Sequence, residues 1–253
     1  MISNLIYFFI FSLGLAVGSF LNCLIYRLET GPDLLKRRSF CPYCKNILSW
    51  PDLIPILSFL FLKGKCRYCQ QKISRQYPLV EIATAIIFLL ISLTISNFYT
   101  MVYLLLISCF LIVIFVYDLK HYLIPDKLIY PAIFLAFLYQ LSNFSIFLNP
   151  LLSAILSSAP FLLIVLISKG KWLGLGDVKL TFFMGLFLGF PNILVALFFS
   201  FLIGAIIGMG LVISRQKTLK SEIPFGPFLV TGTFISLFWG QQLISWYQNL
   251  FLL

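Results

Sequence analysis

The sequence predicts an all-α protein of the membrane: a polytopic bundle of about eight transmembrane helices with a small cytoplasmic zinc-binding loop domain. The first observation is composition, because 61% of the 253 residues are hydrophobic and only 10% are charged. Soluble domains are about half apolar and about a quarter charged. The second is that the basic residues gather in four clusters between long charge-free stretches, and the third is a group of four cysteines within the first cluster. A net charge of +10 would suggest nucleic acid for a soluble protein. Here we expect membrane lipid and no nucleic acid as the partner.

The apolar length suits several crossings, since each takes about 20 mostly apolar residues. The expected spans are residues 5–24, 79–96, 101–117, 128–141, 151–168, two within 178–214, and 225–246. No basic residue precedes the first span, so it does not resemble a cleaved signal peptide. A turn at Gly189–Asn192 divides the long segment. The helix before this turn is short, and we expect it to tilt or to be shielded by neighbouring helices.

Charge placement sets the predicted topology. The proposed outer connections carry no Lys or Arg; they lie around residues 97–100, 142–150, 189–192 and the C-terminal tail. All basic clusters then fall on one side, which the positive-inside rule makes cytoplasmic. Both termini are expected outside.

Two CxxC pairs predict a structural zinc site. Four thiolates satisfy tetrahedral zinc, and the expected ligands are Cys41, Cys44, Cys66 and Cys69. Two disulfides or a redox motif are the alternatives, but a cytoplasmic loop would be reduced. A closed four-thiolate site leaves no position for water, so this metal should stabilise the loop. Cys23 and Cys109 lie in apolar spans and are interpreted as packing residues.

Acid–base chemistry must come from carboxylates. The single histidine, His121, has no GxSxG motif beside it, and HExxH, a complete GxGxxG and a Walker motif are absent. Asp118 and Asp177 both fall at the cytoplasmic ends of their helices, where two carboxyl groups can share a proton and activate water. Asp118 ends an apolar run at a helix C-terminus, which disfavours an anion and suits it to hold that proton.

Other acidic residues receive structural interpretations. Asp126 follows Ile-Pro and is expected to be a helix N-cap. Asp177 could also be an N-cap, and Glu81 could pair with a loop arginine such as Arg75. Gly174 and Gly176, before Asp177, would let a peptide backbone approach closely. We assign substrate binding to these two glycines and to Lys179.

A set of motifs running in order from Gly18 to Pro227 resembles the type IV prepilin peptidases. They are Gly18-Ser-Phe-Leu-Asn22 with Arg27, the paired CxxC motifs, Ile54 to Ser58, Gly64 to Cys66, Ile73 to Glu81, Asp118 to Asp126, Gly174 to Lys179 and Pro224-Phe-Gly-Pro227. The series covers nearly the full chain, and together it is far more specific than a lone GxGD.

This resemblance implies a bifunctional enzyme of the bacterial cytoplasmic membrane. Such enzymes cleave the leader of type IV prepilins or pseudopilins on the cytoplasmic side, then methylate the new N-terminus with S-adenosylmethionine. The family's aspartyl pair corresponds to Asp118 and Asp177. Methyl transfer is associated with residues 18–81, with four cofactor-binding candidates: Gly18, Asn22, Arg27 and Glu81. The expected parts are a first helix (1–26), the four-cysteine loop (27–78) and a transmembrane aspartyl peptidase bundle (79–253).

Two other functions stay open. A proton- or ion-coupled transporter would place its carboxylates near the bilayer midplane and have repeat-related halves. A zinc-knuckle assembly scaffold would tolerate loss of both aspartates.

Overall fold

The computed structural model describes residues 2–30, 39–142, 147–218 and 221–251. Parts of the predicted four-cysteine loop and of the predicted outer connection at 142–150 therefore lie outside the described residues. Within these ranges the chain forms helices and two isolated β-bridges, with no strand, so the predicted all-α class is confirmed.

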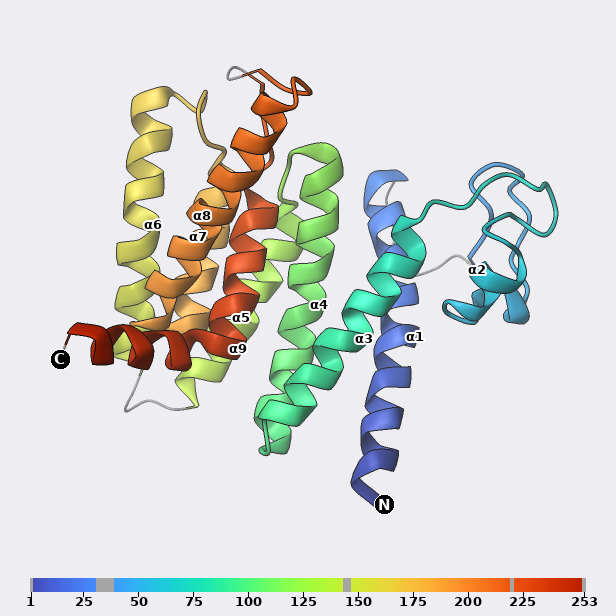
Figure 1. Cartoon of the computed structure of the whole chain (residues 1–253), viewed down its shortest axis with the longest axis horizontal. Helices are drawn as coiled ribbons and strands as arrows, with labels where there is room; N and C mark the ends of the chain where they lie inside the picture. The colour runs from blue at the N-terminus through green and yellow to red at the C-terminus, as the bar shows by residue number, and fades with distance from the viewer. Residues whose placement is uncertain (1, 31–38, 143–146, 219–220, 252–253) are drawn as a thin grey trace. The chain divides into compact units, whose positions relative to one another are not determined.

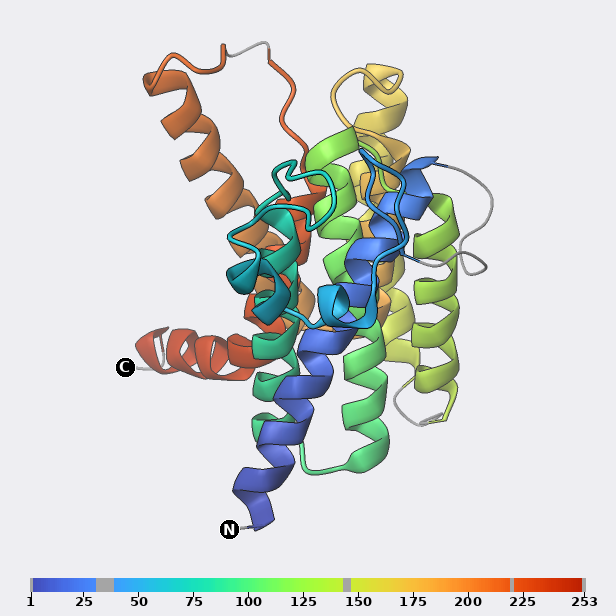
Figure 2. The same ribbon diagram turned by 90° about the vertical axis from the view of Figure 1, so that its right-hand side faces the viewer.

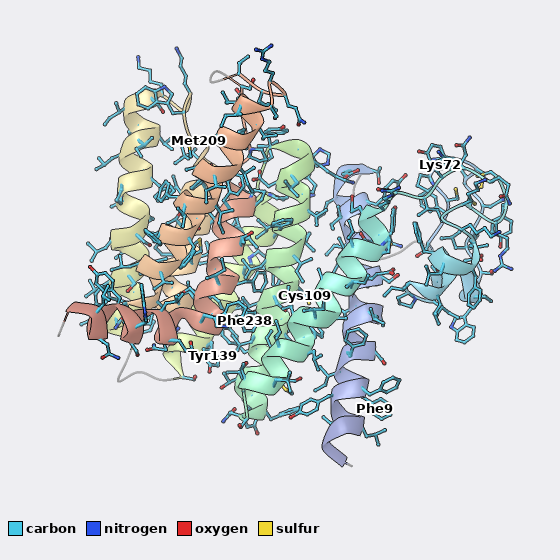
Figure 3. The ribbon with its side chains drawn as sticks, viewed as in Figure 1. Phe9, Lys72, Cys109, Tyr139, Met209 and Phe238 are labelled. Atoms are coloured by element: carbon cyan, nitrogen blue, oxygen red, sulfur yellow. The ribbon has the colours of Figure 1, made fainter. Side chains whose placement is uncertain are left out.

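Each expected span corresponds to a helix. The helices are α1 (Ile2–Thr30), η1 (Trp50–Leu53), α2 (Leu57–Phe61), α3 (Gln76–Thr94), α4 (Phe98–His121), α5 (Asp126–Leu141), α6 (Leu148–Ser168), α7 (Leu175–Leu188), α8 (Asn192–Ile213) and α9 (Gly226–Phe251) (Figure 1). Many of their large apolar side chains face outward; Phe9, for example, projects from the surface of α1 and is 63% exposed (Figure 3). Outward-facing apolar surface on long helices is expected where lipid is the solvent.

Five described helices are long and apolar enough to cross a membrane: α1, α3, α4, α6 and α8. α5 has 16 residues and α7 has 14, which is short for a crossing. α9 has 26 residues, among them four amides, Gln241, Gln242, Gln248 and Asn249. A multi-pass membrane protein is thus supported, but the expected count of about eight spans is not confirmed.

The chain divides into two compact units, residues 1–113 and 114–253, with the boundary inside α4. In the first unit α1 packs directly on α3. Two glycines one helical turn apart make this possible: a Cβ on Gly14 would lie 2.6 Å from Cα of Ala85, and one on Gly18 would lie 2.7 Å from Cα of Glu81. Small residues at this spacing let two membrane helices approach backbone to backbone.

Replacing Gly18 with alanine is expected to destabilise the first unit by about 1–3 kcal/mol, because a methyl group would overlap backbone that cannot rotate away. Thermal unfolding of the detergent-purified protein measures this. Gly210→Ala in α8 is the control, since a Cβ there meets nothing within 4 Å. Equal stability of the two variants would contradict this account of the α1–α3 contact.

In the second unit the short helix α7 contacts α5, α6, α8 and α9. Its residues Leu180, Phe183 and Leu186 are completely buried. On the α6 side, a Cβ on Gly185 would lie 2.5 Å from Cα of Ala154. The expectation that neighbouring helices shield this short helix is confirmed.

Candidate functional site

Asp118 lies in the last turn of α4, within the second unit. It is only 4% exposed, and among the described residues its Oδ2 atom has no hydrogen-bond partner. A buried polar oxygen without a partner is costly, so it calls for an explanation beyond packing. The backbone of Gly226, at the start of α9, lies against this oxygen: a Cβ there would come within 2.5 Å of Oδ2.

Asp177 is the third residue of α7 and is partly exposed. Its Oδ2 accepts a hydrogen bond from the backbone N–H of Gly174 at 3.3 Å. The helix N-cap is therefore Gly174, and Asp177 caps the helix from inside its first turn. Asp177 follows Gly176 and Asp118 lies against Gly226, and one side chain, Ile124, contacts both glycines.

The side chain of Ile124 contacts one glycine in the first turn of α7 and one at the start of α9, beside these carboxyl groups. It is 8% exposed, and its side chain lies against both Gly176 and Gly226, where added Cβ atoms would come within 3.0 and 3.4 Å of it. We expected the space at Gly176 to admit a substrate backbone. The structure fills that space with Ile124.

Lys179 is engaged within the protein. Its Nζ lies 2.6 Å from Oδ1 of Asp126 and 4.9 Å from the ring centroid of Tyr130. The predicted N-cap role of Asp126 is wrong: Pro125 is the N-cap of α5, no side chain caps that helix, and the carboxylate binds Lys179 instead. This ion pair joins the first turns of α5 and α7. Substrate binding by Gly174, Gly176 and Lys179 stays a prediction.

Gly226→Ala is expected to lower the activity of this site more than it lowers stability. The added methyl group would displace the Asp118 carboxylate, which can rotate, so the fold is expected to lose no more than about 1 kcal/mol. Catalytic geometry shifted by about 1 Å costs about 10²-fold in rate. Cleavage assays and thermal unfolding on the same preparation separate the two effects, with Gly210→Ala as the control; unchanged cleavage by Gly226→Ala would exclude a role for this contact.

The four cysteines of the first unit form one cluster. All four Sγ atoms lie within 4.8 Å of one another, and those of Cys41 and Cys69 are 3.9 Å apart. Zinc bonded to sulfur at about 2.3 Å in a tetrahedron sets sulfurs about 3.8 Å apart. All four thiols are free of disulfides, so the residues fit the predicted zinc ion.

The two halves of this cluster are built alike. In each half, the carbonyl of the first cysteine accepts a hydrogen bond from the N–H four positions later, and its N–H donates to the carbonyl five positions later. The partners are Lys45 and Asn46 for Cys41, and Gln70 and Gln71 for Cys66. Lys45 and Gln70 share a left-handed φ of 59°. These local turns aim each pair of sulfurs at one point. Although the Gln71 backbone favours the thiolate, desolvation and the other thiols raise the pKa of Cys69 to about 11.

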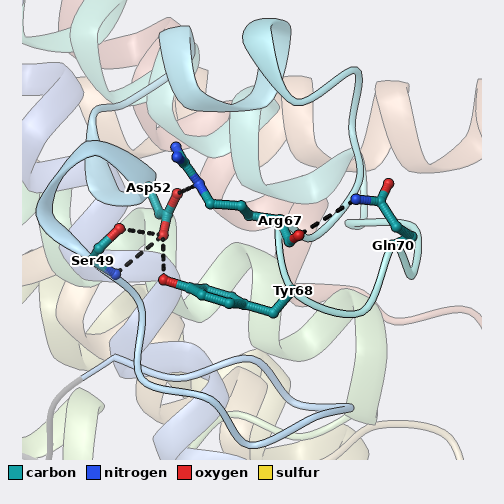
Figure 4. A network of polar contacts seen from close by, with 5 residues as sticks. All are labelled: Ser49, Asp52, Arg67, Tyr68 and Gln70. Carbon is teal, nitrogen blue, oxygen red and sulfur yellow. Dashed lines mark hydrogen bonds and ion pairs between the residues drawn. The ribbon is translucent and has the colours of Figure 1, made fainter.

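Asp52 attaches η1 to the second cysteine pair (Figure 4). Its carboxylate accepts hydrogen bonds from the Ser49 hydroxyl at 2.6 Å and from Arg67 Nε at 2.7 Å. Burial opposes its charge, but the bonds from Ser49 and the Arg67 guanidinium hold the pKa of the Asp52 carboxyl below its ordinary value. Arg67 and Tyr68, also a donor to Asp52, lie between Cys66 and Cys69.

The predicted cofactor-binding residues lie along the α1–α3 contact. Gly18 packs on α3, and the Asn22 amide donates to the carbonyls of Gly18 and Tyr77 and accepts from Gln76. Glu81 is 6% exposed and accepts a bond from the Ile56 N–H at 2.8 Å; pairing with a loop arginine such as Arg75 was one of its two interpretations.

Arg27 lies in the last turn of α1. The contacts described for Gly18, Asn22 and Glu81 lie within the protein, and among the described residues they outline no cradle for S-adenosylmethionine. Binding of this cofactor by the four residues stays a prediction.

Comparison with known proteins connects these features. The model of the "Type IV leader peptidase family" matches residues 104–209, and that of the "Bacterial Peptidase A24 N-terminal domain" matches residues 12–95. The "Prepilin leader peptidase/N-methyltransferase" of Bacillus subtilis (strain 168) is 34% identical over 243 residues, covering 94% of this chain and 96% of that protein. The chain belongs to the type IV leader peptidase family.

Proteins of the same name from other bacteria are also similar to this chain. That of Aeromonas salmonicida (strain A449) is 31% identical over 95% of this chain and 93% of its own length. That of Pseudomonas aeruginosa (strain PAO1) is 30% identical over 93% and 91%. No solved structure matches the chain. Both aspartates and their neighbours Ile124 and Gly176 fall inside the segment matched to the leader peptidase family.

Two residues of the site were not singled out for it from sequence. Ile124 belongs to the Asp118–Asp126 motif, but an apolar residue there gave no sign of its contacts with the two glycines. Gly226 belongs to the Pro224-Phe-Gly-Pro227 motif, which marked the segment but not its contact with Asp118.

Proposed function

We propose that this protein is a membrane endopeptidase that removes the leader from type IV prepilins or pseudopilins and methylates the new N-terminus. The observation that carries the proposal is the pair formed by Asp118, buried with an unpartnered oxygen, and the more exposed Asp177. The proposal is supported by the alignment of this chain with nearly the full length of proteins named prepilin leader peptidase/N-methyltransferase.

The two environments assign different roles to the two carboxyl groups. Asp118 is buried at the C-terminus of α4, where the helix dipole disfavours an anion, which suits a protonated carboxyl group that can donate to the scissile carbonyl. Asp177 receives the Gly174 N–H, which suits a carboxylate. Asp177 takes a proton from water as the oxygen adds to the carbonyl carbon, and Asp118 gives its proton to the carbonyl oxygen. When the tetrahedral intermediate collapses, one of its hydroxyl groups returns a proton to Asp118, the C–N bond breaks and the amine takes the proton from Asp177.

Eight crossings, with the site on the cytoplasmic face, fit this function. The described basic residues lie near the connections α1–α3, α4–α5, α6–α7 and α8–α9, which all fall on one side if α1 and each helix from α3 to α9 cross once, the short α5 and α7 included. Asp118 is three residues from the end of α4, away from the midplane position that a transporter would favour. The first unit would hold a zinc ion on its four cysteines, and S-adenosylmethionine would supply the methyl group.

The experiment is incubation of the purified protein with synthetic prepilins in detergent, with and without S-adenosylmethionine, followed by intact-mass analysis. Leader removal in both samples, and one added methyl group only with S-adenosylmethionine, is the expected result. Intact prepilin in both samples, from a folded and zinc-loaded preparation, contradicts the proposed peptidase.

A further inference from the structure

The hairpin of η1 and α2 exposes an apolar surface that the proposed reaction does not use. Its members are large side chains on a segment of twelve residues: Trp50, Leu53, Leu57, Leu60 and Phe61. Trp50 is 79% exposed and Phe61 is 83% exposed. We refer to these five residues as the apolar end of the loop. A soluble domain of this size rarely leaves such a patch in water unless it binds something.

The apolar end is held beside α3, at the level of the second turn of that helix. Ile56, the N-cap residue of α2, donates its N–H to Glu81 of α3 at 2.8 Å. Glu81 comes five residues after Gln76, the first residue of α3, which places this bond about 7.5 Å along the helix. Figure 1 and Figure 2 both show α2 beside the first turns of α3. α3 is long and apolar enough to cross a membrane, and a hairpin beside the second turn of such a helix would lie at the depth of the headgroup–acyl boundary.

Polar groups in the rest of the loop fix the hairpin in this position. The Asp52 network ties η1 to the second cysteine pair, and Lys72 lies on the side of the loop away from α2 (Figure 3). Lys63 and Lys65 directly follow α2 and are exposed. Apolar side chains followed by lysines match an interface in which acyl chains lie beneath anionic headgroups.

We propose that η1 and α2 form a lipid-binding anchor that inserts the apolar end into the membrane interface beside α3. Its ligand is the phospholipid bilayer, with acyl chains against Trp50 and Phe61 and anionic headgroups near Lys63 and Lys65. Glu81 acts as the positioning residue, because its hydrogen bond sets the depth of α2. The anchor is separate from the peptidase chemistry and does not depend on it.

Bromine quenching of Trp50 tests the anchor directly. Trp172→Phe, Trp239→Phe and Trp246→Phe leave Trp50 as the only tryptophan. In vesicles of phosphatidylcholine and phosphatidylglycerol with brominated acyl chains, its emission is expected to be at least about twofold weaker than in unbrominated vesicles. Quenching by aqueous acrylamide but not by brominated lipid would place Trp50 in water. Quenching by neither would show that protein covers it; both outcomes overturn the proposal.

A matched pair of variants tests the role of Glu81 in the same single-tryptophan protein. Glu81→Leu removes the acceptor for the Ile56 N–H and is expected to reduce bromine quenching about twofold or more. Glu81→Gln keeps an acceptor oxygen and is expected to retain the quenching. Zinc content, measured on both, shows that the cysteine cluster is intact. Unchanged quenching in zinc-loaded Glu81→Leu would exclude Glu81 as the depth-setting residue.

Discussion

Asparagine at position 118 or 177 is expected to lower prepilin cleavage about 10³-fold or more, since each carboxyl group supplies one half of the proton transfer. Asp118→Asn keeps the shape of the buried group beside Gly226 but loses the proton it would donate. Asp177→Asn keeps an oxygen for the Gly174 N–H but loses the base. Initial rates of leader removal, with the substrate in excess, measure the effect.

Asp126→Asn is the control for this pair. It removes a carboxylate of the same unit, but one that binds Lys179 on an exposed surface, where an ion pair contributes about 0–1 kcal/mol. Cleavage is expected to fall no more than about fivefold. If Asp118→Asn or Asp177→Asn retained as much cleavage as this control, the assignment of the dyad would be wrong, and a non-catalytic scaffold would be favoured.

Serine in place of Cys66 is expected to release the metal and unfold the cysteine cluster. Structural zinc sites contribute about 10–16 kcal/mol of apparent binding free energy near neutral pH, and the small loop has few other contacts to hold it. Bound zinc is expected to fall from about one ion per chain to nearly none. Limited proteolysis should then cut between the two CxxC pairs. Zinc analysis and mass mapping of the fragments measure both effects.

Cys23→Ser and Cys109→Ser serve as controls, because both thiols lie in helices outside the cluster. Their zinc content is expected to match the unmodified protein. Leader cleavage is expected to survive Cys66→Ser, because Asp118, Asp177, Ile124 and Gly226 all belong to the second unit. Full zinc retention by Cys66→Ser would rule out a four-thiolate site.

The helices were predictable because membrane helices are local features: an apolar run is readable without knowing its neighbours. The predicted division of residues 178–214 at Gly189–Asn192 agrees with α7 ending at Leu188 and α8 beginning at Asn192. The number of crossings was less predictable. Whether the 14 residues of α7 cross depends on surrounding helices that shield it, which no window of sequence contains.

The site was predictable only where its chemistry is local. The CxxC spacing gave the cysteine cluster, since each turn closes within six residues. Asp126 was misjudged because its partner, Lys179, is 53 residues away. The bond between Ile56 and Glu81 could not be predicted, because its donor is a backbone N–H, which every residue except proline carries. Charge placement put Asp118 and Asp177 at one membrane face, and their catalytic roles stay predictions until the variants are measured.

The repeated cysteine turns bear on how the chain is made. Every predicted zinc ligand precedes α3, and each turn needs only its own residues, so the contacts involved have low sequence separation. The metal site can therefore be complete while the ribosome is still synthesising the second unit. Glu81 emerges soon afterwards and supplies the acceptor for Ile56. All the residues that the predicted zinc site and the Ile56–Glu81 bond need are therefore translated before either aspartate.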